Sequence, residues 1–149
     1  MEVPFPLAWT WTRSFSFAQS PSARETTELL AEALRREGAH EVTTRDEALE
    51  FECPGILGMR RMALLAPISG GSIEIRSAEQ KLEIKYQLQF VLVFWFSLAV
   101  GVVFALLSIK SDPLAHGLLA FSWLYFGNIA ISLLRFPGFL ARTLANSSR

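Results

Sequence analysis

The residues best able to do chemistry in this chain are few and lie apart in the sequence. Glu50 and Glu52 are two residues apart, so both carboxylates share one face of a strand, as a general acid–base pair would require. A solvated strand face carries the same pattern. His40 follows the expected end of a helix, where a histidine complements the helix dipole, and His116 lies in a different segment. We therefore predict no catalytic residues and no enzymatic activity.

Cofactor and metal sites are not indicated either. A single cysteine, Cys53, excludes a disulfide within the chain and any cysteine-rich zinc or iron–sulfur site. The run Ser69-Gly70-Gly71 has glycines like a phosphate-binding loop, but no Lys-Ser/Thr and no helix start follow it. We expect a turn there, and neither a cofactor nor a metal.

Charge is distributed unevenly over the 149 residues. Residues 1–87 carry 10 basic and 13 acidic side chains, whereas residues 88–149 carry 4 basic and 1 acidic side chain. The net charge of zero therefore conceals a polar half and a nearly charge-free half. Such a chain lacks the positive patch that a nucleic-acid-binding protein needs to neutralise phosphates, so we expect no nucleic-acid partner.

Two long uncharged stretches lie in the second half, at 90–109 and 114–134. Each has about the ~20 residues that a helix needs to cross the hydrocarbon core of a bilayer. A soluble domain of this size could not surround two such helices. Pro113 and the charges of Lys110 and Asp112 separate the stretches. The sequence thus predicts a transmembrane helix hairpin within 89–135, with the lipid bilayer as its partner.

Basic residues near the stretch ends predict the orientation of the hairpin. The loop between the stretches has one basic residue, whereas six flank the pair: Arg76, Lys81, Lys85, Arg135, Arg142 and Arg149. Because cytoplasmic flanks are enriched in Lys and Arg, we expect a multi-pass protein of the inner (plasma) membrane with both termini in the cytoplasm. Residues 1–7 lack the features of a cleavable signal peptide.

Small and polar residues within the stretches indicate helix packing. Ser97, Gly101 and Ala105 recur every four residues, a spacing that lets another helix approach closely. That helix is either the second stretch of the same chain or a helix of a second chain. The amide of Asn128 needs a hydrogen-bond partner, which is either a neighbouring helix or a polar ligand or ion.

Two segments have the composition of a membrane surface contact. In 136–149 we expect a short interfacial segment and a frayed tail, with Arg135 and Arg142 directed to anionic headgroups. The apolar side of that segment is formed by Phe136, Phe139, Leu140 and Leu144. The run 56–62 contains Arg60 and Arg61 and is either a second headgroup contact or an ordinary loop.

Residues 1–88 have the pattern of a cytoplasmic α+β domain. We expect a strand near 9–17, and strands near 41–44, 48–53, 62–68, 73–76 and 82–88. Between the first two strands we expect a helix that runs to about 37 and is capped either by Ser20, with Pro21 as its first residue, or by Ser22. Short turns between strands predict a small antiparallel sheet with one covering helix. The aromatic side chains of the first strand are either core or the walls of a ligand pocket. They are Trp9, Trp11, Phe15 and Phe17.

The order of elements resembles that of a group of small bacterial membrane proteins of uncharacterised function. Those proteins have an N-terminal strand–helix–strands domain, a Pro-Ile-Ser-x-Gly-type turn, and then membrane helices. The corresponding turn here is Pro67-Ile68-Ser69-Gly70-Gly71, followed by alternating strands at 72–75 and 82–86. The resemblance covers roughly residues 13 to 110. It implies a similar architecture and brings no catalytic residue with it.

These patterns lead to two expectations for function. The first is a non-enzymatic accessory, regulatory or interaction subunit, whose cytoplasmic domain is held against the bilayer because the last strand runs into the first stretch without a linker. Its partner would be a membrane protein or a second copy of the chain. The alternative is a membrane-surface protein that binds a small molecule or lipid.

Overall fold

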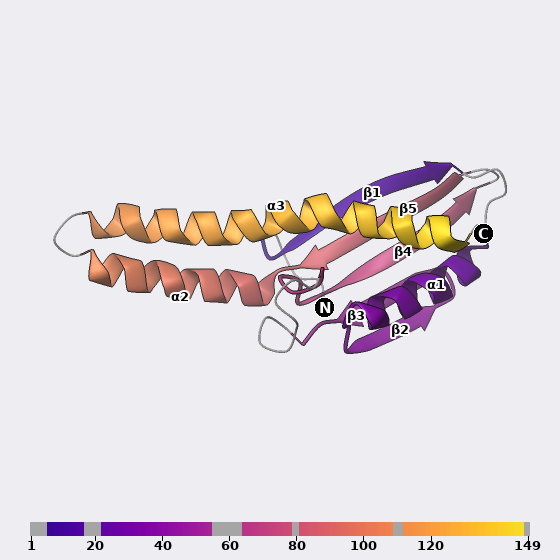
Figure 1. Cartoon of the computed structure of the whole chain (residues 1–149), viewed down its shortest axis with the longest axis horizontal. Helices are drawn as coiled ribbons and strands as arrows, with labels where there is room; N and C mark the ends of the chain where they lie inside the picture. Colours follow the sequence, from indigo (N-terminus) through magenta and orange to yellow (C-terminus); the bar gives the residue numbers. More distant parts are fainter. Residues whose placement is uncertain (1–5, 17–21, 55–63, 79–80, 109–111, 148–149) are drawn as a thin grey trace.

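The computed structural model shows an α+β protein (Figure 1) and describes residues 6–16, 22–54, 64–78, 81–108 and 112–147. Within these residues, a five-stranded antiparallel sheet has the strand order β1-β5-β4-β3-β2. The strands are β1 (Ala8–Ser16), β2 (Glu41–Arg45), β3 (Ala48–Glu52), β4 (Gly70–Ala78) and β5 (Lys81–Gln89). The helices are α1 (Ala23–Arg36), α2 (Val91–Leu107) and α3 (Pro113–Ser147). The α+β class predicted from the sequence is therefore confirmed.

Local sequence signals set the limits of the first helix. The Ser22 hydroxyl accepts a hydrogen bond from the Glu25 amide at 3.1 Å and so caps the start of α1. Gly38, just beyond its end, has a φ of 103°, which a residue with a side chain rarely adopts. The helix buries Leu30 and Leu34 and leaves its charged side chains in solvent.

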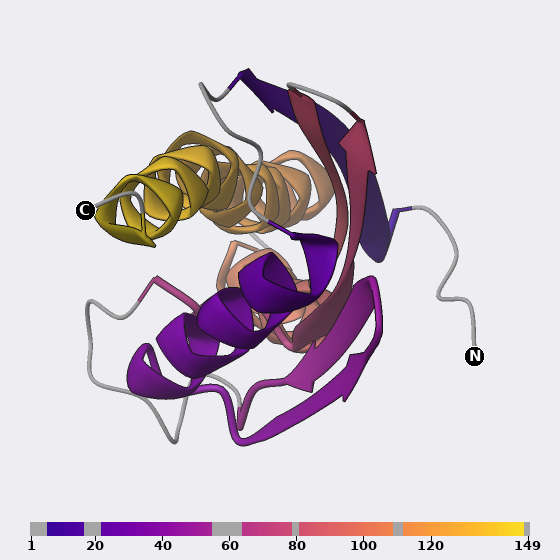
Figure 2. The same cartoon turned by 90° about the vertical axis from the view of Figure 1, so that its right-hand side faces the viewer.

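The inner face of the sheet carries the core. Every second side chain of β5 is buried, and those between are exposed or partly exposed. Leu82, Ile84 and Leu88 are fully buried. Two helices cover this face, α1 and the second half of α3 (Figure 2). The expectation of one covering helix is wrong, because the chain returns from the hairpin and packs α3 on the sheet through Phe136 and Leu140.

The hairpin extends beyond one end of the sheet (Figure 1), where α2 and the first half of α3 lie antiparallel. α3 meets the length and composition of a membrane-crossing helix, over Pro113–Ala145. α2, with 17 residues, is shorter than such a span. Two full-length spans were expected, and the structure shows one long apolar helix with a shorter apolar helix beside it.

The predicted strand near 62–68 is wrong over its described residues. Residues 64–67 form a turn, and the Ile68 amide donates to the Leu65 carbonyl at 2.9 Å. Leu65 and Ile68 are nevertheless fully buried. The apolar run therefore reflects burial of a turn, because a short apolar run has no periodicity that separates a strand from other buried backbone.

Candidate functional site

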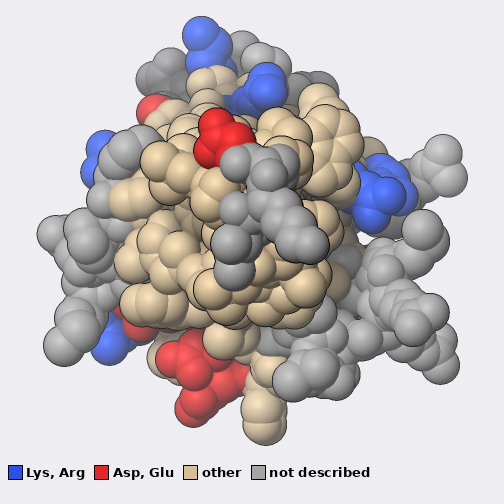
Figure 3. All heavy atoms as spheres, turned by 90° about the vertical axis from the view of Figure 1, so that its left-hand side faces the viewer, with Lys and Arg blue, Asp and Glu red and all other residues tan. Residues whose placement is uncertain are grey.

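The exposed surface of the hairpin is apolar, and we call it the apolar sleeve. It consists of Leu92, Trp95, Phe96, Leu98, Val102, Val103, Phe104, Leu106, Leu107, Leu114, Leu118, Leu119, Trp123, Phe126, Ile131 and Leu134. In the most apolar 18-residue window of α3, only 22% of the residues are buried, so α3 is not enclosed as a core helix would be. Viewed toward the hairpin tip, the surface is mostly uncharged, with charged side chains largely around its edge (Figure 3).

The two helices of the hairpin meet at a pair of glycines. A Cβ added to Gly101 would lie 2.9 Å from the Gly117 carbonyl oxygen, and a Cβ added to Gly117 would lie 2.8 Å from the Gly101 carbonyl oxygen. Ala105 also borders this contact, and Ser97 is fully buried. Of the two alternatives for the small-residue face, the structure shows packing within the chain. The sequence pattern did not single out Gly117.

Asn128 bonds within its own helix. Its side-chain amide donates to the Leu124 carbonyl at 2.6 Å, and its backbone carbonyl accepts from the Ser132 hydroxyl at 2.9 Å. The side-chain NH2 group therefore has a partner one turn back along its own helix.

The junction between β5 and α2 is held by hydrogen bonds to two other segments, one before β1 and one before β4. The Phe90 amide donates to the Leu7 carbonyl at 2.8 Å, immediately before α2 begins. The Ser69 hydroxyl donates to the Gln89 carbonyl at 3.1 Å and accepts from the Leu92 amide at 3.4 Å. Ser69, expected only as part of a turn, thus helps to cap α2 from its position just before β4.

Aromatic side chains fasten α3 to the same junction. The Tyr125 hydroxyl and the Trp9 indole both donate to the Pro6 carbonyl, at 2.5 and 2.8 Å. The Tyr125 ring is fully buried and lies against Phe94 of α2, with ring centroids 5.5 Å apart. One residue of α3 therefore contacts both α2 and the segment that leads into β1. The sheet and the hairpin are joined without a flexible linker.

The second half of α3 differs from the expected interfacial segment. The helix continues through Pro137 to Ser147, and its apolar side lies on the sheet instead of facing a membrane. Phe136, for example, is fully buried with its ring centroid 5.0 Å from that of Tyr86. Arg135 and Arg142 are exposed on the outward part of the helix. Arg60 and Arg61 lie outside the described residues.

The aromatic side chains of β1 belong to the sheet's inner face. Trp9 pairs with Leu88 and Trp11 pairs with Tyr86 across the strands, and both tryptophans are half-buried against the core. Their rings stack 5.8 Å apart. The described part of this row thus packs as core at a sheet edge, and Phe17 lies outside the described residues.

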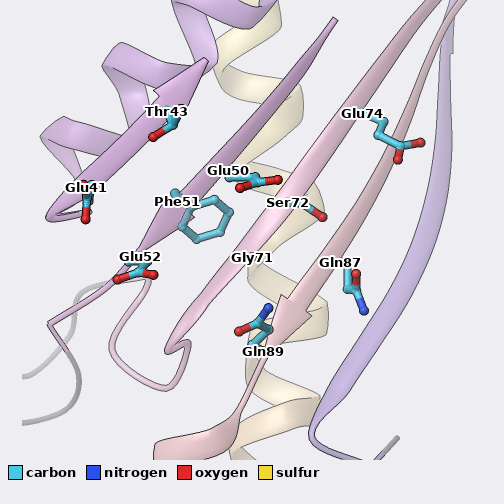
Figure 4. Close-up of a pocket in the computed structure, with 10 residues that line it drawn as sticks. All are labelled: Glu41, Thr43, Glu50, Phe51, Glu52, Gly71, Ser72, Glu74, Gln87 and Gln89. Atoms are coloured by element: carbon cyan, nitrogen blue, oxygen red, sulfur yellow. The ribbon is translucent and has the colours of Figure 1, made fainter. Parts of the chain in front are cut away.

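An acidic hollow of about 680 Å³ lies on the sheet's outer face (Figure 4). Glu50 on β3 is paired with Ser72 on β4, and Ser72 is paired with Gln87 on β5. The other lining residues are Glu41, Thr43, Phe51, Glu52, Gly71, Glu74 and Gln89. Glu50 and Glu52 share this face as predicted, and both are exposed to solvent. Carboxylates in such a position attract cationic groups.

Burial affects the titratable side chains of the domain core. Burial raises the pKa of the Cys53 thiol to about 12, so it stays protonated and unreactive. Burial also raises the pKa of Tyr86, an effect that Arg13 partly opposes through a hydrogen bond and its charge. His40 and His116 are both exposed and far apart, and no group of three or more described His, Cys, Asp or Glu side chains could hold a metal ion.

No family model, curated protein or solved structure matches the chain. Its function must therefore be inferred from its own residues and their arrangement.

Proposed function

We propose that the protein is a non-enzymatic integral membrane protein whose hairpin inserts into the bilayer and holds the sheet domain at the cytoplasmic surface. In that position it serves as an accessory or interaction subunit of a membrane assembly. The apolar sleeve carries this proposal. Monomeric soluble proteins rarely expose contiguous apolar patches beyond a few hundred Å². Removing such a surface from water contributes roughly 1.5–3 kcal/mol for each large side chain that becomes fully buried.

The ends of the hairpin suit this location. Asp112 caps α3 at the tip, where its carboxylate accepts from the Ala115 amide at 3.1 Å, and His116 lies in the same first turn. These polar groups belong in a headgroup layer. At the opposite end, the hydrogen-bonded junction passes directly into the sheet.

An interaction role is supported by the form of the domain. The sheet's outer face is not covered by either helix of the domain (Figure 2), and polar and charged side chains line its hollow. Since the junction is rigid, a partner bound to this face would be held in a fixed position relative to the bilayer. The ligand-binding alternative would use the aromatic row of β1, but Trp9 and Trp11 pack against the core.

The four tryptophans of the chain allow a direct test of insertion. Trp95 and Trp123 are 59% and 80% exposed on the apolar sleeve, whereas Trp9 and Trp11 lie in β1. We expect brominated phospholipids to quench the fluorescence of a Trp9→Phe/Trp11→Phe variant in proteoliposomes. The matched Trp95→Phe/Trp123→Phe variant should show little quenching. Equal quenching of the two variants, or none in either, would contradict insertion through the hairpin.

Purification in mild detergent then separates the two functional classes. An accessory subunit should elute in a stoichiometric complex with a defined membrane protein or with a second copy of itself. A ligand-binding protein should instead retain one lipid or small molecule, identified by mass spectrometry, at one equivalent per chain.

A further inference from the structure

The apolar surface of the hairpin ends at different heights on its two helices. Gly101 and Gly117 are in contact, so residues equally far from them along α2 and α3 lie at similar heights. On the side of the sheet, the exposed apolar surface of α2 ends at Leu92. With a helical rise of about 1.5 Å per residue, Leu92 lies about 14 Å along the axis from the glycine pair. On α3 the exposed apolar surface reaches Leu134, about 26 Å from the same pair.

The same offset is present at the tip. There the apolar surface extends to Leu107 on α2, about 9 Å beyond the glycine pair, but only to Leu114 on α3, about 5 Å beyond it. The apolar band on α3 is therefore displaced toward the sheet at both of its ends. On α3 this band is about 30 Å long, which equals the thickness of a hydrocarbon core.

Charged side chains are also distributed unevenly between α3 and the rest of the domain. α3 has no acidic residue between Pro113 and Ser147, and Arg135 and Arg142 lie seven residues apart on one flank of its outward surface. The outer face of the sheet, on the other side of the domain, carries the acidic hollow. α1, which lies beside α3, has three acidic and three basic residues within its bounds. An anionic bilayer surface would thus attract the α3 side of the domain, which has two basic and no acidic side chains. The sheet's outer face offers no comparable excess of positive charge, because basic side chains such as Lys85, which is 3.9 Å from Glu74, alternate there with glutamates.

We infer that the hairpin is tilted in the bilayer so that the outward face of α3 leans into the anionic headgroup layer, with Leu134 in lipid and Arg135 and Arg142 on phosphates. The sheet's outer face, with its hollow lined by glutamates, is then turned away from the membrane, toward the cytoplasm. This inference rests on the proposed function, because it requires an inserted hairpin. It keeps the headgroup contact expected for Arg135 and Arg142. The lipid contact, however, is made by Leu134 and not by the apolar side of 136–144, which packs on the sheet.

Nitroxide labels at three single cysteines test this arrangement in a Cys53→Ala background. The sites are Val102→Cys on the sleeve, Leu134→Cys on the leaning face and Thr43→Cys on the sheet's outer face, all exposed positions. In proteoliposomes containing phosphatidylglycerol, the labels at 102 and 134 should be relaxed more by oxygen than by a water-soluble nickel chelate. The label at 43 should show the reverse.

The possible failures are distinguishable. A lipid-exposed label at 102 with a water-exposed label at 134 overturns the tilt and leaves insertion intact. Water exposure at both 102 and 134 overturns insertion itself, and the tilt with it.

A matched pair of charge variants tests the role of the arginines. Arg135→Gln/Arg142→Gln should reduce the depth of the label at 134 in phosphatidylglycerol vesicles and have no effect in vesicles of phosphatidylcholine alone. Arg76→Gln/Lys81→Gln removes the same charge from the strands of the sheet and should leave that depth unchanged in both. Equal effects of the two double variants, or no effect of either, would overturn the assignment of the arginines to headgroups.

Discussion

At the scale of single residues, the closest contact in the hairpin depends on two missing side chains. Gly101 and Gly117 bring the backbones of α2 and α3 together, and each would clash with the other's carbonyl if it carried a Cβ. Close approach of this kind lets two helices pack by van der Waals contact in lipid, where no hydrophobic driving force joins them. The spacing of Ser97, Gly101 and Ala105 predicted the α2 side of this contact, whereas no pattern indicated Gly117 on α3.

We predict that Gly101→Leu destabilises the protein in detergent by about 1–3 kcal/mol, the usual effect of overpacking a close contact. Thermal unfolding followed by circular dichroism measures this. Gly127→Ala is the matched control, because a Cβ at Gly127 meets nothing within 4 Å and alanine is the better helix former. An unchanged melting temperature for Gly101→Leu would show that the two backbones do not approach closely.

The buried thiol of Cys53 gives a second prediction. Because burial raises its pKa to about 12 from 9.0, the thiolate fraction of the folded protein near pH 8 falls roughly a thousandfold. We therefore expect slow reaction with a maleimide in the folded protein and fast reaction after denaturation.

The same pKa shift has a consequence for stability. The folded state favours the neutral thiol. Its contribution to the free energy of unfolding is therefore complete below pH 9 and is lost as the pH rises toward 12. A Cys53→Ala variant should lose less stability than the parent over this alkaline range. Equal losses in both proteins would contradict a raised pKa for this group.

At the scale of elements, α3 takes part in two different structures. Its first half belongs to the apolar sleeve, and its second half completes the core of the sheet domain. Phe136 and Leu134 lie almost side by side in sequence, yet the former is fully buried and the latter is 81% exposed. One continuous helix thus connects the apolar hairpin with the sheet.

This difference predicts contrasting effects of two alanine substitutions. Phe136→Ala should destabilise the sheet domain by about 3–5 kcal/mol, since it opens a cavity against Tyr86. Leu134→Ala should have little effect on unfolding in detergent. Hydrogen exchange of β4 and β5 reports the stability of the domain directly. If the two variants gave the same exchange rates, the second half of α3 would not be docked on the sheet.

The sequence predicted the helices and strands that have a clear hydrophobic periodicity. It did not predict which of these elements pack against one another. Alternation in 82–88 correctly predicted β5. The sequence predicted α1 with either Ser20 or Ser22 as its cap, and the structure shows Ser22 in that position. The apolar side of 136–144 was also correctly recognised as one face of a segment, but lipid and a sheet are both apolar surroundings. Only contacts between distant parts of the chain, such as Phe136 with Tyr86, distinguish them.

The candidate site shows the same limit. The spacing of Glu50 and Glu52 predicted that they share one face of a strand. Glu41 and Glu74 join them in the acidic hollow because β3 pairs with β2 and β4. Likewise, the role of Ser69 depends on the position of α2 beside the start of β4. Strand register and helix docking are long-range properties that local periodicity does not contain.

At the scale of the whole molecule, the protein divides into an apolar hairpin and a polar domain that share one helix. The junction contains hydrogen bonds from the segment before β1, from the start of β4 and from α3. An anchor that only tethered a domain would not need these connections. In the function we propose, the property that matters is the fixed orientation of the sheet relative to the hairpin.

The central claim is that the hairpin crosses the bilayer with the domain in the cytoplasm, and cysteine accessibility in intact cells tests it most directly. In a Cys53→Ala background, one variant carries Ser111→Cys between the helices and another carries Glu28→Cys on the exposed side of α1. We predict that a membrane-impermeant maleimide labels position 111 in intact cells and position 28 only after permeabilisation. Labelling of position 28 alone in intact cells would reverse the orientation. Labelling of neither position before permeabilisation, with both labelled afterwards, would show that the hairpin does not cross the membrane.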